Sequence, residues 1–258
     1  MKKKNVDISI IIPYFRKKKY FHQSIKSVLN QTFKKYEIII IYDDENKGDL
    51  KFIKKITKNC KLIKIIENNK NIGAGLSRNK GISISRGKYI AFLDADDYWK
   101  KEKLRYQINF MKKNNLNFSH TNYFLIDEKS KKYGCIKVKK ELTYSDLMKS
   151  CDIGLSTVII NRTLLKGHNF PKLKTKEDYV LWLRLSRLNV KICGLNKNLT
   201  YWRKLDDSLS NSLNQKLFDA FKVYFYYEKN NFIHSIFCVI RLSVNAILKK
   251  INSSLFTN

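Results

Sequence analysis

Four short runs of β-branched residues, separated by segments with helical spacing, constrain the fold of this chain more than any other feature. The strand-like runs cover 8–12, 37–41, 61–66 and 89–93. Helical spacing is expected over about 20–30, 49–58 and 74–86. Strands that are apolar on both faces and alternate with helices predict an α/β fold, in which a doubly wound, Rossmann-like and mostly parallel sheet has helices on both faces.

The predicted sheet also indicates where a ligand would bind. In open α/β sheets, ligands bind beyond the carboxyl ends of the strands. The segments that directly follow the runs are therefore candidates, and they are Pro13-Tyr14-Phe15, Tyr42-Asp43-Asp44-Glu45 and Asp94-Ala95-Asp96-Asp97.

Three carboxylates stand within four positions at Asp94, Asp96 and Asp97, in a chain with 52 Lys and Arg against 22 Asp and Glu. Two such charges about 4 Å apart repel by about 1 kcal/mol in water and about 4 kcal/mol near a protein surface. A divalent cation shared with substrate phosphates would offset this repulsion, since Mg²⁺ usually takes only one or two protein carboxylates. A polar turn in which one Asp caps the next helix is the alternative.

Two further segments add weight to the acidic cluster. The pair Asp43-Asp44 follows a strand run and could accept a hydrogen bond from a base N–H group, although such a pair can also be only a turn. Residues 71–79 contain Gly73 and Gly75 and lead into a predicted helix. Small residues there let backbone N–H groups approach a phosphate, and Arg78 supplies a positive charge one turn into the helix.

The C-terminal segment differs from the rest of the chain. Residues 217–228 keep helical spacing, and residues 232–248 form an apolar helical pattern with a narrow polar stripe of His234, Cys238, Arg241 and Asn245. Seventeen residues interrupted by Arg241 are too short and too polar to cross a hydrocarbon core of ~30 Å. An interfacial amphipathic helix, helped by Lys249 and Lys250, fits better, and packing against its own domain or a dimer partner is the alternative.

Composition narrows the function classes. The formal net charge of +30 favours phosphates, anionic lipid or nucleic acid as partners, but the lysines are scattered and no zinc-finger, homeodomain or RNA-recognition signature is present. The five cysteines are odd in number and have no CxxC pair, so neither a disulfide framework nor a structural zinc site is expected and a reducing cytosol is the simplest location. Residues 1–5 are basic but do not resemble a signal peptide.

Several ordered motifs over residues 8–99 resemble the nucleotide-binding half of family 2 glycosyltransferases of the GT-A fold. The motifs are Ser9-Ile10-Ile11-Ile12-Pro13-Tyr14, Ser27-Val28-Leu29-Asn30-Gln31-Thr32, Asp43-Asp44, Asn71-Ile72-Gly73, Arg78-Asn79, Ser85-Arg86-Gly87-Lys88-Tyr89-Ile90 and Phe92-Leu93-Asp94-Ala95-Asp96-Asp97.

The resemblance implies a role for each matching residue on the donor side. Asp44, or else Asp43, would pair with the donor base, and Arg78 would lie on the nucleotide side of the donor. Asp94 and Asp96 stand at the DxD signature, whose second Asp is the usual direct ligand of the Mn²⁺ or Mg²⁺ on the diphosphate. The matching residues Pro13, Tyr14, Asn71 and Gly73 complete the implied donor site.

The similarity continues into residues 100–210, where one helix over about 100–114, two or three strands and a helix from Glu177 are expected. Residues 175–184 resemble the family's acidic motif at the head of a helix, in which Asp178 would act as the base, and a carboxylate at a helix N-terminus is expected to stay ionised. Helix capping by Glu177 and Asp178 is the alternative. Residues 201–210 resemble the tyrosine-arginine segment that ends in Ser-x-Ser. Many relatives have a histidine at the position of Leu205, and its absence leaves Arg203 and Lys204 to neutralise the leaving diphosphate.

As a whole, the resemblance implies an inverting glycosyltransferase that moves a hexose from a nucleotide diphosphate sugar, UDP-linked, to a glycan or lipid-linked acceptor in cell-surface polysaccharide or lipopolysaccharide synthesis. Such an enzyme would use Mn²⁺ or Mg²⁺ and work as a peripheral protein on the inner face of the cell membrane. Residues 1–210 would form the catalytic domain, with a nucleotide-binding half over 1–99 and an acceptor half over 100–210, and residues 211–258 a helical extension. A basic nucleic-acid-binding protein and a nucleotidyltransferase of similar fold are the alternatives.

Overall fold

The computed structural model describes residues 6–205 and 213–254, with the side chains up to residue 249. The strands in this part are β1 Ile8–Tyr14, β2 Tyr36–Tyr42, β3 Ile63–Glu67, β4 Tyr89–Phe92, β5 Tyr98–Trp99, β6 Phe118–Ile126, β7 Lys132–Ile136, β8 Glu141–Leu142, β9 Ile159–Asn161 and β10 Ile192–Arg203. The α-helices are α1 Lys18–Leu29, α2 Leu50–Thr57, α3 Ala74–Ser83, α4 Lys103–Lys113, α5 Tyr144–Lys149, α6 Glu177–Arg187, α7 Leu213–Lys222 and α8 Phe232–Ser254.

The described strands form one mixed sheet, whose main path has the order β3-β2-β1-β4-β9-β6-β10-β5, with β7 beside β6 and β8 beside β10. Strands β1 to β4 pair in parallel. Strand β9 runs antiparallel to both β4 and β6, whereas β6 and β10 are parallel. The predicted parallel sheet is therefore confirmed in the first half of the chain, and the second half adds antiparallel pairs.

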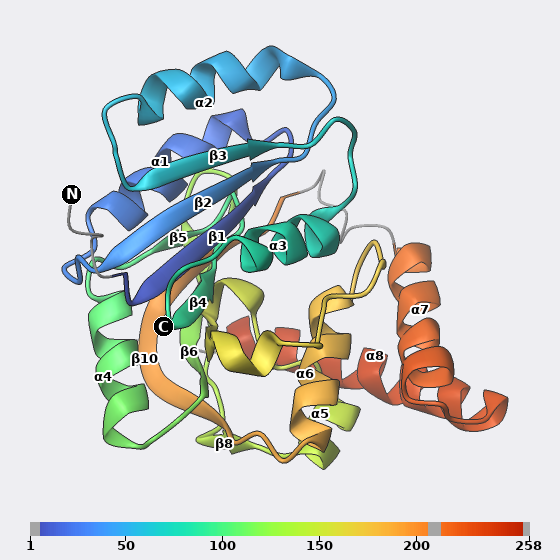
Figure 1. Cartoon of the computed structure of the whole chain (residues 1–258). Coiled ribbons are helices and arrows are strands. Elements are labelled where there is room, and N and C mark those ends of the chain that lie inside the picture. The colour runs from blue at the N-terminus through green and yellow to red at the C-terminus, as the bar shows by residue number, and fades with distance from the viewer. Residues whose placement is uncertain (1–5, 206–212, 255–258) are drawn as a thin grey trace.

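The two faces of the sheet pack against different helices (Figure 1). Because side chains alternate along a strand, Ile10 and Ile12 of β1 enter a core that α1, α2 and α4 share, while Ile11 enters the core on the other face. That second core includes residues of α5 and α6 and the buried side chains Cys238 and Leu242 of α8. Helices thus cover both faces, as predicted.

The helix bounds follow the predicted ones closely except at the C-terminus. Helix α7 ends at Lys222, and a π-helical turn, Val223–Tyr227, separates it from the loop before α8. Helix α8 has 23 residues and extends to Ser254, beyond the predicted end at residue 248. The two-residue strand β5, which follows the acidic segment directly, has no counterpart among the predicted strand runs.

Candidate active site

The acidic segment between β4 and β5 turns its three carboxylates toward different partners. Asp94 Oδ1 accepts a hydrogen bond from Arg78 Nη2 at 2.7 Å. Asp96 Oδ2 lies 3.2 Å from Lys17 Nζ. Asp97 is buried and accepts hydrogen bonds from Ser156 Oγ at 2.6 Å and from the Arg203 backbone N–H at 2.8 Å. The side chains of Asp94 and Asp96 are 32% and 16% exposed, whereas Asp97 holds the segment in place from inside the fold.

Ser156 fixes this segment at two points. Its hydroxyl donates to Asp97 and accepts from the backbone N–H of Asp94 at 3.0 Å. Its carbonyl oxygen accepts from Trp99 Nε1 at 2.7 Å. Ser156 belongs to a short 3₁₀ turn, Leu155–Thr157, that is 59 positions from Asp97 in the sequence. Sequence reasoning missed this residue, because no local pattern links a lone serine to a loop so distant.

Arg78 joins the acidic segment to the start of α6. Its Nη1 donates to Glu177 Oε1 at 2.6 Å, and its Nη2 donates to Asp94. Gly75 allows this approach of α3 to α6, since a Cβ at that position would lie 3.0 Å from Glu177 Cγ. Burial disfavours the charged form of Arg78, but the two carboxylates outweigh burial and raise its pKa, so the guanidinium stays positive.

Two carboxylates stand at the N-terminus of α6, where Lys176 has a left-handed φ of 66°. Burial raises the pKa of Glu177 to about 7, with Arg78 acting in the opposite direction and Asp178 in the same one. Burial also raises the pKa of Asp178, and Arg78, Lys176 and the backbone N–H of Tyr179, 2.8 Å from Oδ1, only partly offset it. The position at a helix N-terminus predicts a low pKa for Asp178. The effect of burial on this pKa is larger and has the opposite sign, which makes the carboxylate a stronger proton acceptor than an exposed Asp.

Asp43 has a structural role in this arrangement. Its two oxygens accept hydrogen bonds from Asn68 Nδ2 at 2.8 Å and from the backbone N–H groups of Ile72 and Gly73, both at 2.9 Å. Asn71 Oδ1 also accepts from the Gly73 N–H, at 3.0 Å, and Gly73 adopts a φ of 87° that favours glycine. Thus Asp43 holds the glycine-containing loop, and the N–H groups of Ile72 and Gly73 are already bonded to it. Asp43 and Asp44 are the two carboxylates predicted to contact the nucleobase of the donor, and of these Asp44 is the one that faces a cavity.

That cavity has a volume of about 350 Å³ and lies beyond the carboxyl ends of β1 and β2. It is lined by Arg16, Asp44, Asn46, Gly48 and Asp49. Asp44 accepts from Arg16 Nε at 3.0 Å and from the Asn46 N–H at 3.1 Å.

The predicted residues Pro13 and Tyr14 support this cavity from inside the fold. Both are buried in β1. The Tyr14 ring stacks on Tyr42 with a centroid distance of 5.4 Å. The Tyr14 hydroxyl donates to Asp49 Oδ2 at 2.8 Å, so it contributes to the cavity through Asp49.

Ion pairs connect the cavity with the remaining acidic side chains. Arg16 contacts Asp44, and the next residue, Lys17, contacts Asp96. Arg78 then links Asp94 to Glu177, which precedes Asp178. The three acidic segments are therefore brought together at one edge of the sheet, as the α/β topology predicts.

Arg203, which the resemblance assigned to the leaving diphosphate, is buried and bonded within the protein. Its guanidinium donates to the carbonyl oxygens of Asp96 at 3.0 Å and Asp127 at 2.9 Å, and to Gln23 Oε1 at 2.6 Å, and the residue is only 4% exposed. These bonds tie the acidic segment to the turn after β6 and occupy the guanidinium with acceptors from the protein. A buried guanidinium needs such acceptors.

Lys204, in contrast, is exposed. Burial lowers the pKa of Lys216 on α7, and the nearby charges of Lys176 and Lys204 lower it further. Three lysines thus gather near the head of α6, two of which the sequence reasoning missed. The Ser-x-Ser end of the tyrosine-arginine segment, Ser208 and Ser210, lies outside the described residues.

The donor set at the acidic segment fits a divalent ion that is shared with a substrate. Among residues 6–205 and 213–249, no group of three or more His, Cys, Asp or Glu side chains is placed to enclose a metal. Burial raises the pKa of Asp96 and the charge of Asp94 raises it further, while Lys17 only partly offsets both effects, so a cation near the two carboxylates would stabilise the ionised form of Asp96. Mg²⁺ and similar ions commonly take one or two carboxylates and complete their shell with phosphate oxygens and water.

The family model and the similar protein sequences all describe glycosyltransferases. Residues 9–164 match the family model described as glycosyl transferase family 2. TuaG of Bacillus subtilis, a putative teichuronic acid biosynthesis glycosyltransferase, is 30% identical over 245 residues that cover 95% of this chain and 97% of TuaG. WfaP of Escherichia coli, a UDP-Glc:alpha-D-GlcNAc-diphosphoundecaprenol beta-1,3-glucosyltransferase, is 36% identical over 245 residues that cover 94% of each chain.

Solved structures share the fold. Residues 1–349 of S. aureus TarS, crystallised with UDP-GlcNAc, match with a TM-score of 0.72 and 21% identity over 89% of this chain and 69% of that one. The mannosyltransferase PcManGT from Pyrobaculum calidifontis, in complex with GDP-Man and Mn²⁺, matches with a TM-score of 0.67 and 10% identity over 87% of this chain and 64% of that one.

Proposed function

Since the chain belongs to glycosyl transferase family 2, we propose that it transfers a hexose from a UDP-linked donor to a lipid-linked glycan acceptor, with inversion at the anomeric carbon. The family, its surface-polysaccharide type and the GT-A fold that the motifs predicted are confirmed, and the chain is a glycosyltransferase. The observation that carries the finer proposal is that Asp44, Asp96 and Asp94, each directly beyond or near a strand end, form ion pairs with the neighbouring residues Arg16 and Lys17 and with Arg78, which also binds Glu177 at the head of α6.

The nucleoside would occupy the cavity beside Asp44. A volume of about 350 Å³ suits a nucleoside, and its polar lining can fix the orientation of a base. Asp44 would accept a hydrogen bond from the base N–H, and Arg16, whose side chain is 62% exposed, can turn toward the phosphates. The choice of UDP follows from two similar proteins: TarS was crystallised with UDP-GlcNAc, and WfaP is named for a UDP-Glc donor.

The diphosphate would lie over Asp94 and Asp96. We assign these two carboxylates to a Mn²⁺ or Mg²⁺ ion, which when bound would neutralise charge on the departing diphosphate. Lys17, now paired with Asp96, and the exposed Lys204 would add positive charge to the same region. Arg203 would act indirectly, by holding the Asp96 carbonyl and so the shape of the segment.

The reaction would use Asp178 as the base. The acceptor hydroxyl oxygen attacks the anomeric carbon from the face opposite the diphosphate, so a carbon–oxygen bond to the acceptor forms as the bond to the diphosphate breaks. The hydroxyl proton passes to Asp178, whose raised pKa favours proton transfer at neutral pH. Arg78 would position both the acidic segment and the start of α6 for this step.

The acceptor assignment comes from the relatives. WfaP and a second E. coli relative, WfgD, are named for a GlcNAc-diphosphoundecaprenol acceptor, and TuaG for teichuronic acid biosynthesis. We therefore place the present reaction in surface polysaccharide or lipopolysaccharide assembly, at the inner face of the cell membrane.

A donor and acceptor screen tests this function. The chain, supplied with Mn²⁺ or Mg²⁺, is incubated with UDP-Glc, UDP-GlcNAc or GDP-Man and a short-chain lipid diphosphate carrying GlcNAc, and the products are resolved by mass spectrometry. The expected outcome is transfer from a UDP-sugar with release of UDP and an inverted anomeric proton coupling in the NMR spectrum. Release of pyrophosphate would favour a nucleotidyltransferase instead, and a retained anomeric configuration would exclude Asp178 as a base for direct displacement.

A further inference from the structure

Helix α8 turns its apolar side toward solvent. Ile233 is 81% exposed, Phe237 57%, Ile240 56% and Ile247 60%. With about 3.6 residues per turn, these positions fall on one side of the helix. A surface helix of a soluble domain normally buries such a stripe. A continuous exposed apolar face of this kind marks a site of interaction with another protein or a membrane.

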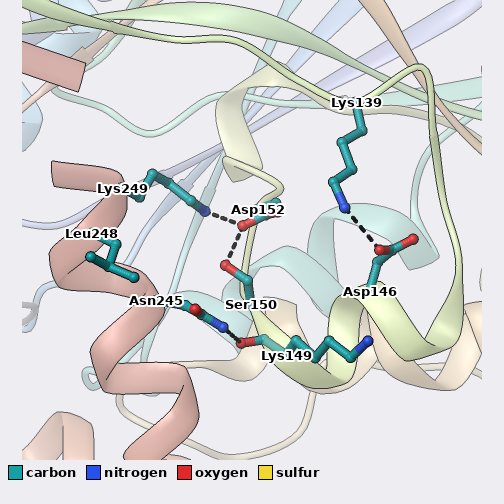
Figure 2. A pocket seen from close by; sticks show the side chains of 8 residues that line it. All are labelled: Lys139, Asp146, Lys149, Ser150, Asp152, Asn245, Leu248 and Lys249. Atoms are coloured by element: carbon teal, nitrogen blue, oxygen red, sulfur yellow. Dashed lines mark hydrogen bonds and ion pairs between the residues drawn. The ribbon is translucent and has the colours of Figure 1, made fainter. Parts of the chain in front are cut away.

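The polar side of α8 faces the domain instead. Arg241 Nη2 donates to the Met148 carbonyl at 3.1 Å, and Asn245 Nδ2 donates to the Lys149 carbonyl at 2.8 Å. Lys249 pairs with Asp152 in the loop after α5 (Figure 2). These contacts flank a cavity of about 380 Å³ between α5 and α8, which none of the predicted active-site residues lines. The narrow polar stripe seen in the sequence thus holds the helix to its own domain.

The charge around this face selects the partner. From Lys229 to the C-terminus the sequence contains four Lys and Arg residues and no Asp or Glu. Lys229, in the loop before α8, is exposed, and the whole chain carries a formal net charge of +30. An apolar stripe on a segment without acidic residues matches a leaflet that contains anionic lipid, because the apolar residues enter the acyl boundary while the positive charge of the protein attracts the headgroups. A second copy of this chain would present the same positive charge and be repelled.

The polar anchors also decide how the helix meets the membrane. Its 23 residues reach about 35 Å at 1.5 Å per residue. The window Phe232–Lys249 has a mean hydropathy of 1.5, so by length and composition α8 could cross a bilayer. Crossing would detach Arg241 and Asn245 from α5 and bury them in hydrocarbon, which is costly. Lying flat keeps every one of these contacts.

We propose that the outer face of α8 docks the enzyme flat on a leaflet that contains anionic lipid, with Ile233, Phe237 and Ile240 as its inserted residues. This face shares no side chain with the proposed active site, so docking and sugar transfer can be tested separately.

Vesicle flotation of the full chain tests the proposal. The probes are vesicles of phosphatidylcholine alone and of phosphatidylcholine mixed with phosphatidylglycerol. The variants Phe237→Asp and Ile240→Asp alter the outer face, and Tyr106→Asp, at an aromatic residue of α4 that is 39% exposed, is the matched control. Removing one inserted apolar side chain should reduce binding by at least about tenfold, whereas the control should bind like the natural chain. Turnover with a water-soluble acceptor should be the same for all four proteins.

Several outcomes would overturn the proposal. Undiminished flotation of both variants would remove α8 from docking, and equal binding to the two vesicle types would remove the anionic requirement. Resistance of the membrane-bound chain to alkaline carbonate extraction would mean that α8 spans the bilayer. A dimer in vesicle-free buffer that Phe237→Asp dissociates, measured by sedimentation, would assign the face to a second copy.

Discussion

The Arg78 guanidinium on α3 lies 2.6 Å from the Glu177 carboxylate at the head of α6, across 99 positions of sequence. Its second terminal nitrogen contacts Asp94, so one buried cation joins the acidic segment to the helix that carries the proposed base. The acidic segment and the acidic motif at the head of α6, which are far apart in the sequence, are thus connected through the Arg78 side chain.

Loss of that cation should destabilise the fold strongly. Replacing Arg78 by Met would remove the buried cation that Glu177 and Asp94 share. Breaking a buried ion pair in this way costs about 3–5 kcal/mol in the free energy of unfolding. Urea denaturation measures the change in the free energy of unfolding. The control is Lys54→Met, since the side chains of Lys54 and its partner Glu67 are 56% and 36% exposed and their ion pair should contribute only about 0–1 kcal/mol. Equal losses in the two variants would contradict this account.

Glu177 should make stability depend on pH. Its pKa in the fold is about 7, whereas an unfolded glutamate has a pKa of roughly 4.3. Between these values the folded chain binds more protons, so this group's favourable contribution is complete at low pH and is lost as pH rises toward 7. The free energy of unfolding should therefore fall by about 2–3 kcal/mol more in the natural chain than in Glu177→Gln between about pH 4.5 and pH 7.5. A Gln substitution at Glu141, whose side chain is 52% exposed, serves as the control and should leave the pH profile unchanged.

Asp178→Asn should abolish transfer while donor binding survives. The amide cannot accept the proton of the acceptor hydroxyl, and general-base catalysis contributes about 10²–10⁴ in rate. Turnover is measured by UDP release, and donor affinity by calorimetry with UDP. Asp146→Asn, in the capping box of α5, should retain full turnover. Normal turnover by Asp178→Asn would remove Asp178 from the role of base.

The adjacent acids Asp43 and Asp44 should respond to amide substitution in opposite ways. Asp43→Asn would place an amide N–H group or a weaker acceptor against the N–H groups of Ile72 and Gly73, and an unsatisfied buried donor costs about 1–3 kcal/mol in stability. Asp44→Asn should lower UDP affinity by about tenfold and cost less stability than Asp43→Asn, since the amide oxygen can still accept from the Asn46 N–H group and the other partner, Arg16, is 62% exposed. Thermal unfolding and UDP calorimetry on both variants separate these effects. The reverse pattern would assign the contact with the nucleobase of UDP to Asp43.

The sequence predicts the frame of this site better than its internal contacts. Strand runs such as Ile8 to Ile12 are buried on both faces, and that property alone is enough to place Asp43, Asp44 and Asp94 at strand ends. Which oxygen meets which donor depends on tertiary packing. Arg203, for example, reaches the Asp96 carbonyl from 107 positions away, and no periodicity in the sequence encodes that contact.

Helix α8 shows the same limit at the level of a whole element. Its period correctly identifies the polar stripe that contains Arg241 and Asn245. The period gives no direction, however, because a helical pattern fixes which residues share a face and not which face turns toward the domain. Tertiary contacts orient the helix: the backbone carbonyls at the end of α5 accept from this stripe, and Cys238 and Leu242 pack into the core.

Two acids of the same segment, Asp96 and Asp97, should separate ligand binding from folding. Asp96 is paired with Lys17, whose side chain is 23% exposed, and is one of the two carboxylates proposed for the metal. Asp96→Asn should therefore weaken metal-dependent UDP binding by about tenfold or more and leave the fold intact. Asp97 is buried against Ser156 and the Arg203 N–H, so Asp97→Asn should cost about 1–3 kcal/mol in unfolding free energy and affect UDP binding through the segment's shape. Titration of UDP with and without Mn²⁺, together with urea denaturation, measures both. If Asp96→Asn binds UDP equally well with and without Mn²⁺ while Asp97→Asn keeps a response to Mn²⁺, the metal acts through Asp96. If instead Asp96→Asn keeps the full response to Mn²⁺, the assignment of Asp96 as a metal ligand fails.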